Sequence, residues 1–137
     1  MSSEHALRVM IVEDAAVISR YLLALVENVP GVALAAVTDS VSGALALLGQ
    51  AEPDIIILDI HLPDGNGLTV LEAAKQRPHP PWVIVFTGSA DYQYKRQALL
   101  AGAEYFIDKN KNFLQVEKAL LEIIYQAEAR QQNRDPA

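Results

Sequence analysis

Short apolar runs alternate along the chain with longer stretches whose apolar residues recur at helical spacing. The run at 55–58 is Ile-Ile-Ile-Leu, which is typical of a strand covered on both faces. Strands that alternate with helices across short connections predict an α/β fold, a parallel sheet sandwiched by helices. Because parallel crossovers are right-handed, few topologies fit. The predicted strands cover residues 7–12, 32–37, 55–58, 82–86 and 104–107.

The stretches between these runs carry helix signals. From 15 to 29 apolar residues stand at i, i+3, i+4, i+7 and i+11, and Pro30-Gly31 ends the pattern. Ser40, or Asp39 before it, can cap a second helix, and Gly102 stands at the C-terminal cap of another. The five predicted helices cover 15–29, a stretch with Val41, Ala44, Leu45 and Leu48 on one face, 68–77, 91–101, and a stretch with Phe113, Val116, Leu120, Ile123 and Ala127 on one stripe.

The length of 137 residues fits one domain. We expect an N-terminal tail at 1–6, the domain at 7–126, and the end of the last helix with a polar tail at 127–137. The tail does not decide between a stand-alone protein and a fragment of a longer one.

Composition narrows the class of protein. The chain has no cysteine, which excludes disulfides and thiolate metal sites. Its N-terminus lacks the features of a secretory signal, and no apolar run approaches the ~20 residues that span a bilayer. A cytoplasmic protein without a membrane partner is expected. The net charge of −6 argues against direct nucleic acid binding, so proteins or small ions are the expected partners.

Polar residues follow four of the predicted strands. Glu13 and Asp14 end the first, Asp59 the third, Thr87 the fourth, and Asp108-Lys109 the fifth. In an open parallel sheet, ligands bind beyond the carboxyl ends of the strands. The sequence therefore predicts one rim that carries carboxylates, a hydroxyl and an ammonium group.

This set of groups suits phosphoryl chemistry. Carboxylates ~4 Å apart repel by about 4 kcal/mol per pair at an effective dielectric near 20. A Mg²⁺ ion, which prefers oxygen ligands, would offset that repulsion, with Asp14 as ligand and Glu13 assisting directly or through water. An aspartate can also act as the nucleophile that forms an aspartyl phosphate. Asp59 is our choice because it ends the most apolar run, with Lys109 and Thr87 matching the added charge.

Four motifs, in this order and spacing, resemble the receiver domains of two-component response regulators. They are Val-Glu-Asp at 12–14, Ile-Leu-Asp-Ile-His-Leu-Pro-Asp-Gly at 57–65, Phe-Thr-Gly at 86–88 and Gly-Ala-Glu-Tyr-Phe-Ile-Asp-Lys at 102–109. The resemblance covers about residues 7–126. It implies a chemotaxis-regulator-like, flavodoxin-like (βα)5 fold, a doubly wound five-stranded parallel sheet of order 2-1-3-4-5.

The resemblance also implies a role for individual residues. It makes Asp59 the phosphoacceptor, and it places Mg²⁺, or Mn²⁺ instead, on Glu13, Asp14, Asp59 and the backbone carbonyl of His61. Thr87 is then the switch hydroxyl, Lys109 the phosphate-contacting lysine and Phe106 the switch aromatic, with Tyr105 as its neighbouring competitor. One departure is Asn110, where the family commonly has a proline after a cis bond. Since a cis non-proline bond costs ~3 kcal/mol, we expect a trans bond and a shifted loop.

The function that this resemblance implies is a signalling switch, not a turnover enzyme. The domain would accept a phosphoryl group from a histidine kinase or a histidine phosphotransfer protein. It would then change the face formed by the fourth helix, fifth strand and fifth helix, which meets an effector protein, an output domain or a second copy of the chain.

Two alternatives belong to other classes. A phosphate-independent adaptor would keep the fold and act by binding alone, but it predicts gaps in the acidic pocket, and the sequence has none. A flavodoxin-like cofactor carrier needs a glycine- or hydroxyl-rich phosphate loop after the first strand. Glu13 and Asp14 stand there instead and would repel a phosphate without a metal.

Overall fold

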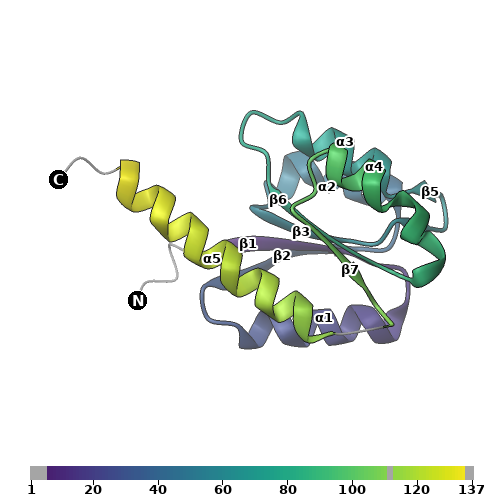
Figure 1. The fold of residues 1–137 in the computed structure, drawn as a ribbon, viewed down its shortest axis with the longest axis horizontal. Coiled ribbons are helices and arrows are strands. Elements are labelled where there is room, and N and C mark those ends of the chain that lie inside the picture. The colour runs from purple at the N-terminus through teal and green to yellow at the C-terminus, as the bar shows by residue number, and fades with distance from the viewer. Residues whose placement is uncertain (1–5, 111–112, 135–137) are drawn as a thin grey trace.

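The computed structural model, which describes residues 6–110 and 113–134, contains a five-stranded parallel sheet between two layers of helices (Figure 1). The order across the sheet is β2-β1-β3-β6-β7, and each neighbouring pair is parallel. This order is the expected 2-1-3-4-5 pattern, so the predicted doubly wound fold is confirmed. The strands are β1 (Leu7–Val12), β2 (Val32–Thr38), β3 (Ile55–Leu58), β6 (Trp82–Thr87) and β7 (Tyr105–Asp108).

Two apolar cores lie on the two faces of the sheet. Helices α1 (Ala16–Asn28) and α5 (Leu114–Arg134) cover one face, and α2 (Val41–Ala51), α3 (Leu68–Lys75) and α4 (Lys95–Leu100) cover the other (Figure 1). In β3, Ile55 and Ile57 pack into the first core, and Ile56 and Leu58 into the second. Each such buried side chain stabilises the fold by about 1.5–3 kcal/mol. The run of four apolar residues follows from burial on both faces.

The segment after β6 differs from the single helix predicted at 91–101. A 3₁₀ helix, η2 (Ser89–Tyr94), comes first, and α4 follows it. The Asp91 amide donates to the Gly88 carbonyl over 3.0 Å, which is the i to i+3 bond of a 3₁₀ turn. Gly102 has a φ of 108°, the left-handed conformation expected of the residue that follows a helix.

Three smaller expectations also need correction. Helix α3 ends at Lys75 and not at Arg77, and Leu45 of α2 is exposed instead of sharing the buried face. Helix α5 continues to Arg134, so most of the stretch at 127–137, expected to hold the end of the helix and a polar tail, is helical. The Arg130 guanidinium lies 4.7 Å from the centre of the Trp82 ring, so the last part of α5 contacts the start of β6. Residues 1–5 of the expected N-terminal tail at 1–6, and residues 135–137, lie outside the described residues.

The loop after β3 contains a short hairpin that the sequence pattern did not predict. Strands β4 (His61–Leu62) and β5 (Gly65–Asn66) pair antiparallel. Between them, the Asp64 carboxylate accepts hydrogen bonds from the Val41 and Ser42 amides at 2.7 and 3.0 Å. These two backbone hydrogen bonds lower the pKa of Asp64, and the bond from Ser42 has the larger effect. The loop thus caps α2 together with Ser40, whose hydroxyl accepts from the Gly43 amide as expected of an N-cap.

Within the described residues, no helix has the length and apolar character needed to cross a membrane.

Candidate functional site: an acidic rim around Asp59

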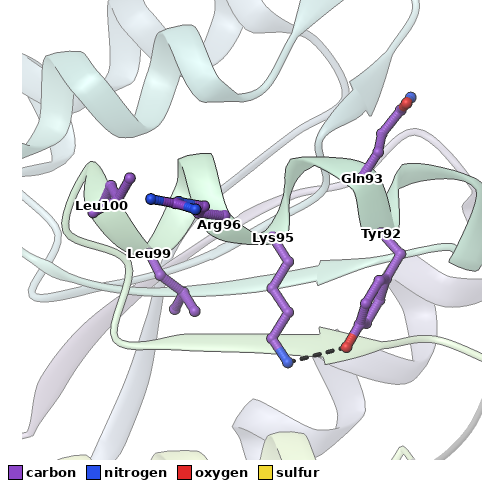
Figure 2. Close-up of a pocket in the computed structure, with 6 residues that line it drawn as sticks. All are labelled: Tyr92, Gln93, Lys95, Arg96, Leu99 and Leu100. Atoms are coloured by element: carbon purple, nitrogen blue, oxygen red, sulfur yellow. Dashed lines mark hydrogen bonds between the residues drawn. The ribbon is translucent and has the colours of Figure 1, made fainter.

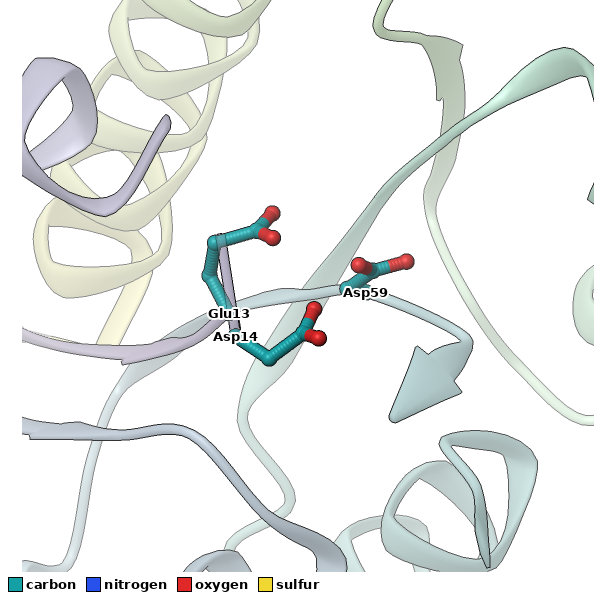
Figure 3. A group of neighbouring side chains, drawn as sticks. All are labelled: Glu13, Asp14 and Asp59. Carbon is teal, nitrogen blue, oxygen red and sulfur yellow. The ribbon is translucent and has the colours of Figure 1, made fainter. Parts of the chain in front are cut away.

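The polar residues predicted to share a rim do meet at the carboxyl ends of the strands. The register of β1 and β3 pairs Val12 with Leu58, and the Asp59 amide donates to the Val12 carbonyl over 2.9 Å. This pairing places Asp59 beside Glu13, the residue after Val12. Oxygens of the Glu13, Asp14 and Asp59 carboxylates all lie within 4.8 Å of one another, and Figure 3 shows the three groups turned toward a common space.

Three donors hold the Asp59 carboxylate, which is only 4% exposed. Its Oδ1 accepts from the Thr87 hydroxyl at 2.9 Å and from the His61 amide at 3.2 Å. Its Oδ2 accepts from the Lys109 ammonium at 2.9 Å. These donors come from three different segments of the chain, so the carboxylate is fixed in orientation before any substrate arrives.

Lys109 also pairs with Glu13, which is 3% exposed. The ammonium lies 2.8 Å from Glu13 Oε1, and the Ala15 amide donates to Oε2 over 3.1 Å. Burial raises the pKa of Glu13, and Asp59 adds to that rise, although Lys109 and the Ala15 amide oppose it. Burial alone would lower the pKa of Lys109, but its hydrogen bonds to Glu13 and Asp59 outweigh burial and raise it. Lys109 therefore stays charged and offsets one of the two buried carboxylates.

The third carboxylate opens the cluster to solvent. Asp14 is exposed, whereas Glu13 and Asp59 are buried. Every donor in the cluster is an oxygen atom, the ligand type that hard divalent cations such as Mg²⁺ prefer. One accessible and two buried carboxylates fit an ion that keeps part of its water shell. His61 contributes its amide to Asp59, its side chain is exposed, and the predicted role of its carbonyl stays a prediction.

Phe106 and Tyr105 lie on opposite faces of the sheet edge. Tyr105 packs with the core under α1 and α5, and its hydroxyl donates to Glu122 of α5 over 3.2 Å. Phe106 packs with the other core, and its ring meets the Tyr92 ring edge-to-face at 5.9 Å between centres. Since Tyr92 belongs to η2, just beyond Thr87, Phe106 is the aromatic residue on the side of the predicted switch.

Sequence reasoning missed Asp91. Its Oδ2 lies 3.0 Å from the Thr87 hydroxyl oxygen, so Thr87 contacts two carboxylates. Asp91 stands four residues after Thr87, but helical periodicity does not show that η2 turns its carboxylate back toward the strand end.

The bond before Asn110 agrees with expectation. Among the described residues no peptide bond is cis, so the Lys109–Asn110 bond is trans. The Asn110 amide donates to the Asp108 carboxylate over 2.8 Å.

Comparison with known proteins assigns the chain to a family. Residues 9–121 match the model of the response regulator receiver domain. The chain is 35% identical over 112 residues to protein-glutamate methylesterase/protein-glutamine glutaminase 1 of Pseudomonas savastanoi, covering 77% of this chain and 31% of that protein. It is 28% identical over 116 residues to the DNA-binding transcriptional activator DevR/DosR of Mycobacterium tuberculosis, covering 85% of this chain and 54% of that protein. The chain thus spans about a third to a half of the curated relatives it matches.

Solved structures agree with these matches. The response regulator domain of Thermotoga maritima CheB superposes with a TM-score of 0.76 at 28% identity, covering 96% of this chain and 99% of that one. A LuxR-family DNA-binding response regulator from Staphylococcus aureus shares the fold, with a TM-score of 0.78 at 21% identity over 86% of this chain and 98% of that one. The chain therefore belongs to the family of response regulator receiver domains.

Proposed function

We propose that this chain is a phosphorylation-driven switch that accepts a phosphoryl group on Asp59. The observation that carries the proposal is the arrangement around this carboxylate. It is buried and held by Thr87, His61 and Lys109, beside the carboxylates of Glu13 and Asp14. A carboxylate oriented in this way is a positioned nucleophile with a hydroxyl and an ammonium ready for the charge that it would receive.

The proposed step transfers a phosphoryl group from a histidine nitrogen of the donor protein to a carboxylate oxygen of Asp59. The donor is a phosphohistidine on a sensor kinase or on a phosphotransfer protein. An Asp59 oxygen attacks phosphorus, an O–P bond forms, and the P–N bond breaks. The histidine nitrogen keeps the electron pair and takes up a proton. We assign to Thr87 and Lys109 the hydrogen bonds that neutralise the oxygens of the transferred group.

We assign the metal site to Glu13, Asp14, Asp59 and the carbonyl of His61. A bound Mg²⁺, or Mn²⁺, would supply positive charge to the carboxylates and to the phosphoryl oxygens at the same time. The fit rests on the three carboxylates whose oxygens lie within 4.8 Å, and on the exposure of Asp14. Lys109 alone leaves this cluster with an excess of negative charge, which is the reason that a cation is expected to bind.

The partner surface that we propose is the groove lined by Tyr92, Gln93, Lys95, Arg96, Leu99 and Leu100 (Figure 2). Leu100 is 76% exposed, and Lys95 donates to the Tyr92 hydroxyl over 3.1 Å. Two cations beside leucines, on a chain of net charge −6, favour a partner segment with acidic and apolar side chains. Tyr92 of the groove contacts Phe106 and directly follows Asp91, whose carboxylate accepts from Thr87 at the site.

The activity of a longer protein is a separate question from that of residues 7–126, which we propose as the receiver domain. Some relatives are named as methylesterases and others as transcriptional regulators, and the chain spans 31% and 54% of two of them. We assign to the receiver domain the switching role alone, without turnover of a substrate. Its phosphoryl donor makes the cytoplasm the expected compartment. The complete acidic pocket gives the adaptor alternative no support.

The chemical nature of the adduct tests this proposal. A phosphoryl group on a carboxylate is an acyl phosphate, which neutral hydroxylamine cleaves, whereas phosphoserine and phosphothreonine survive it. The protein is incubated with Mg²⁺ and acetyl phosphate, desalted, and divided between hydroxylamine and a matched salt. We expect one adduct by mass spectrometry and its loss in hydroxylamine only. An adduct that survives hydroxylamine would place the phosphoryl group on a hydroxyl and overturn the proposal.

A further inference from the structure

The Thr87 hydroxyl lies between two carboxylates. Its oxygen is 2.9 Å from Asp59 Oδ1 and 3.0 Å from Asp91 Oδ2. Both partners are acceptors when ionised, and a threonine hydroxyl carries a single proton. Thr87 can therefore donate to only one of them at a time, and the two distances give neither carboxylate a geometric advantage.

Within residues 6–110 and 113–134, the side-chain hydrogen bond that reaches the Asp91 carboxylate comes from Thr87. Asp59 also accepts from His61 and Lys109, which stay in place when Thr87 turns away. The Asp91 side chain is half-buried in the first turn of η2, and Thr87 is fully buried. Asp59 therefore keeps two donors when Thr87 turns away, whereas Asp91 loses the charge-assisted hydrogen bond that Thr87 gives it.

We infer that Asp91 is a positioning residue that competes with the phosphoacceptor site for the Thr87 proton and so slows phosphoryl transfer. This inference rests on the function proposed above. Transfer needs the Thr87 proton on a phosphoryl oxygen, and each conformer in which it faces Asp91 is unproductive.

The same competition links the site to the partner surface. Asp91 and Tyr92 are neighbours in η2, and the Tyr92 ring contacts Phe106. When Thr87 donates to the phosphoryl group, Asp91 loses its donor, and η2 loses a contact that joins it to the end of β6. The proton of one hydroxyl thereby connects the state of Asp59 to the segment that borders the groove.

Replacement of Asp91 tests the competition by the direction of its effect. We expect both Asp91→Asn and Asp91→Ala to take up phosphoryl groups from acetyl phosphate about fivefold faster than the wild type, the factor that corresponds to one ordinary hydrogen bond. In Asp91→Asn the amide can donate to the Thr87 oxygen and leave its proton free. Initial rates are measured by intact-protein mass spectrometry at fixed Mg²⁺. Slower or unchanged rates in both variants would overturn the inference.

Two controls separate competition from a general effect of charge. Asp39→Asn removes a negative charge just after β2, where the carboxyl ends of the parallel strands lie. This variant should label at the wild-type rate. In a Thr87→Ala background the gain from Asp91→Asn should disappear, because no proton is left to compete for. A gain that persists without the Thr87 hydroxyl would show that charge or local structure is responsible, and it would overturn the inference.

The outcomes also distinguish this inference from the proposed function. A wild-type protein that forms no adduct would contradict both the phosphoacceptor role of Asp59 and the competition by Asp91. A wild-type protein that labels, with Asp91 variants that label at the same rate, would remove the competition and leave the phosphoacceptor role of Asp59 standing.

Discussion

Replacing Lys109 with methionine should lower the free energy of unfolding by about 3 kcal/mol when divalent ions are absent, the cost of leaving buried charges unpaired. The Lys109 ammonium lies 2.8 Å from Glu13 and 2.9 Å from Asp59, and both carboxylates are almost fully buried. Methionine keeps much of the apolar side chain but removes the charge, so two carboxylates face each other without compensation. Urea denaturation of the two proteins in a chelating buffer measures the difference.

The pH dependence of this variant has a defined sign. The pKa of Glu13 is raised above its ordinary value of 4.5 by burial, and loss of Lys109 removes a contact that holds it down. Between 4.5 and the raised value, folded protein keeps a proton that unfolded protein releases. Stability should therefore rise as the pH falls through this window, and the variant should recover part of its deficit there.

Lys118→Met is the matched control, because Lys118 is an exposed lysine of α5. It should change the free energy of unfolding by less than about 0.5 kcal/mol. Lys109→Met as stable as Lys118→Met at neutral pH would show that the ion pairs of Lys109 do not stabilise the fold. It would contradict the claim that Lys109 compensates the buried carboxylates.

Chelation of divalent ions should reduce the initial rate of phosphoryl uptake about 100-fold or more, because several kcal/mol of charge stabilisation would be lost. Asp14 is the ligand that can be tested with the least damage to the fold, since its side chain is exposed. Asp14→Asn should raise the Mg²⁺ concentration for half-maximal labelling about tenfold or more, as loss of even an outer-shell partner has effects of that size. Labelling rates across a Mg²⁺ titration give both results.

The control for this titration is again Asp39→Asn, which removes an exposed carboxylate at the carboxyl end of β2. Its half-maximal Mg²⁺ concentration should match that of the wild type. Equal Mg²⁺ dependence of Asp14→Asn and the wild type, or full labelling in the chelator, would contradict the assignment of the metal site.

Much of the fold could be predicted because burial on both faces leaves a plain pattern. The run at 55–58 coincides with β3, since a strand between two cores carries no polar position. The rim could be predicted because parallel strands end on one side, which brings Glu13, Asp59, Thr87 and Lys109 together.

What could not be predicted depends on contacts between distant segments. The hairpin at 61–66 and the capping of α2 by Asp64 need the loop after β3 to meet a helix 22 residues earlier in the chain. The contact of Arg130 with the Trp82 ring near the end of α5 joins residues 48 positions apart, which helical periodicity does not reveal. Helical periodicity at 91–101 does not reveal a 3₁₀ turn, and so the contact between Asp91 and Thr87 was missed.

The double role of Glu13 was also beyond the sequence pattern. It was predicted as an assisting metal ligand, and it also forms an ion pair with Lys109, which is 96 residues away. Strand ends place the two residues on one rim, but the reach of the lysine side chain decides which carboxylates it bridges.

Intact-protein mass spectrometry after incubation with Mg²⁺ and acetyl phosphate tests the phosphoacceptor role of Asp59 most directly. The wild type, Asp59→Asn and Asp54→Asn are treated in parallel. Asp54 is the control because it lies at the opposite end of β3, where its carboxylate accepts from the Arg8 amide over 2.8 Å. One phosphoryl adduct on the wild type and on Asp54→Asn, and none on Asp59→Asn, is the predicted result. An adduct that persists on Asp59→Asn, or that is absent from the wild type, would contradict it.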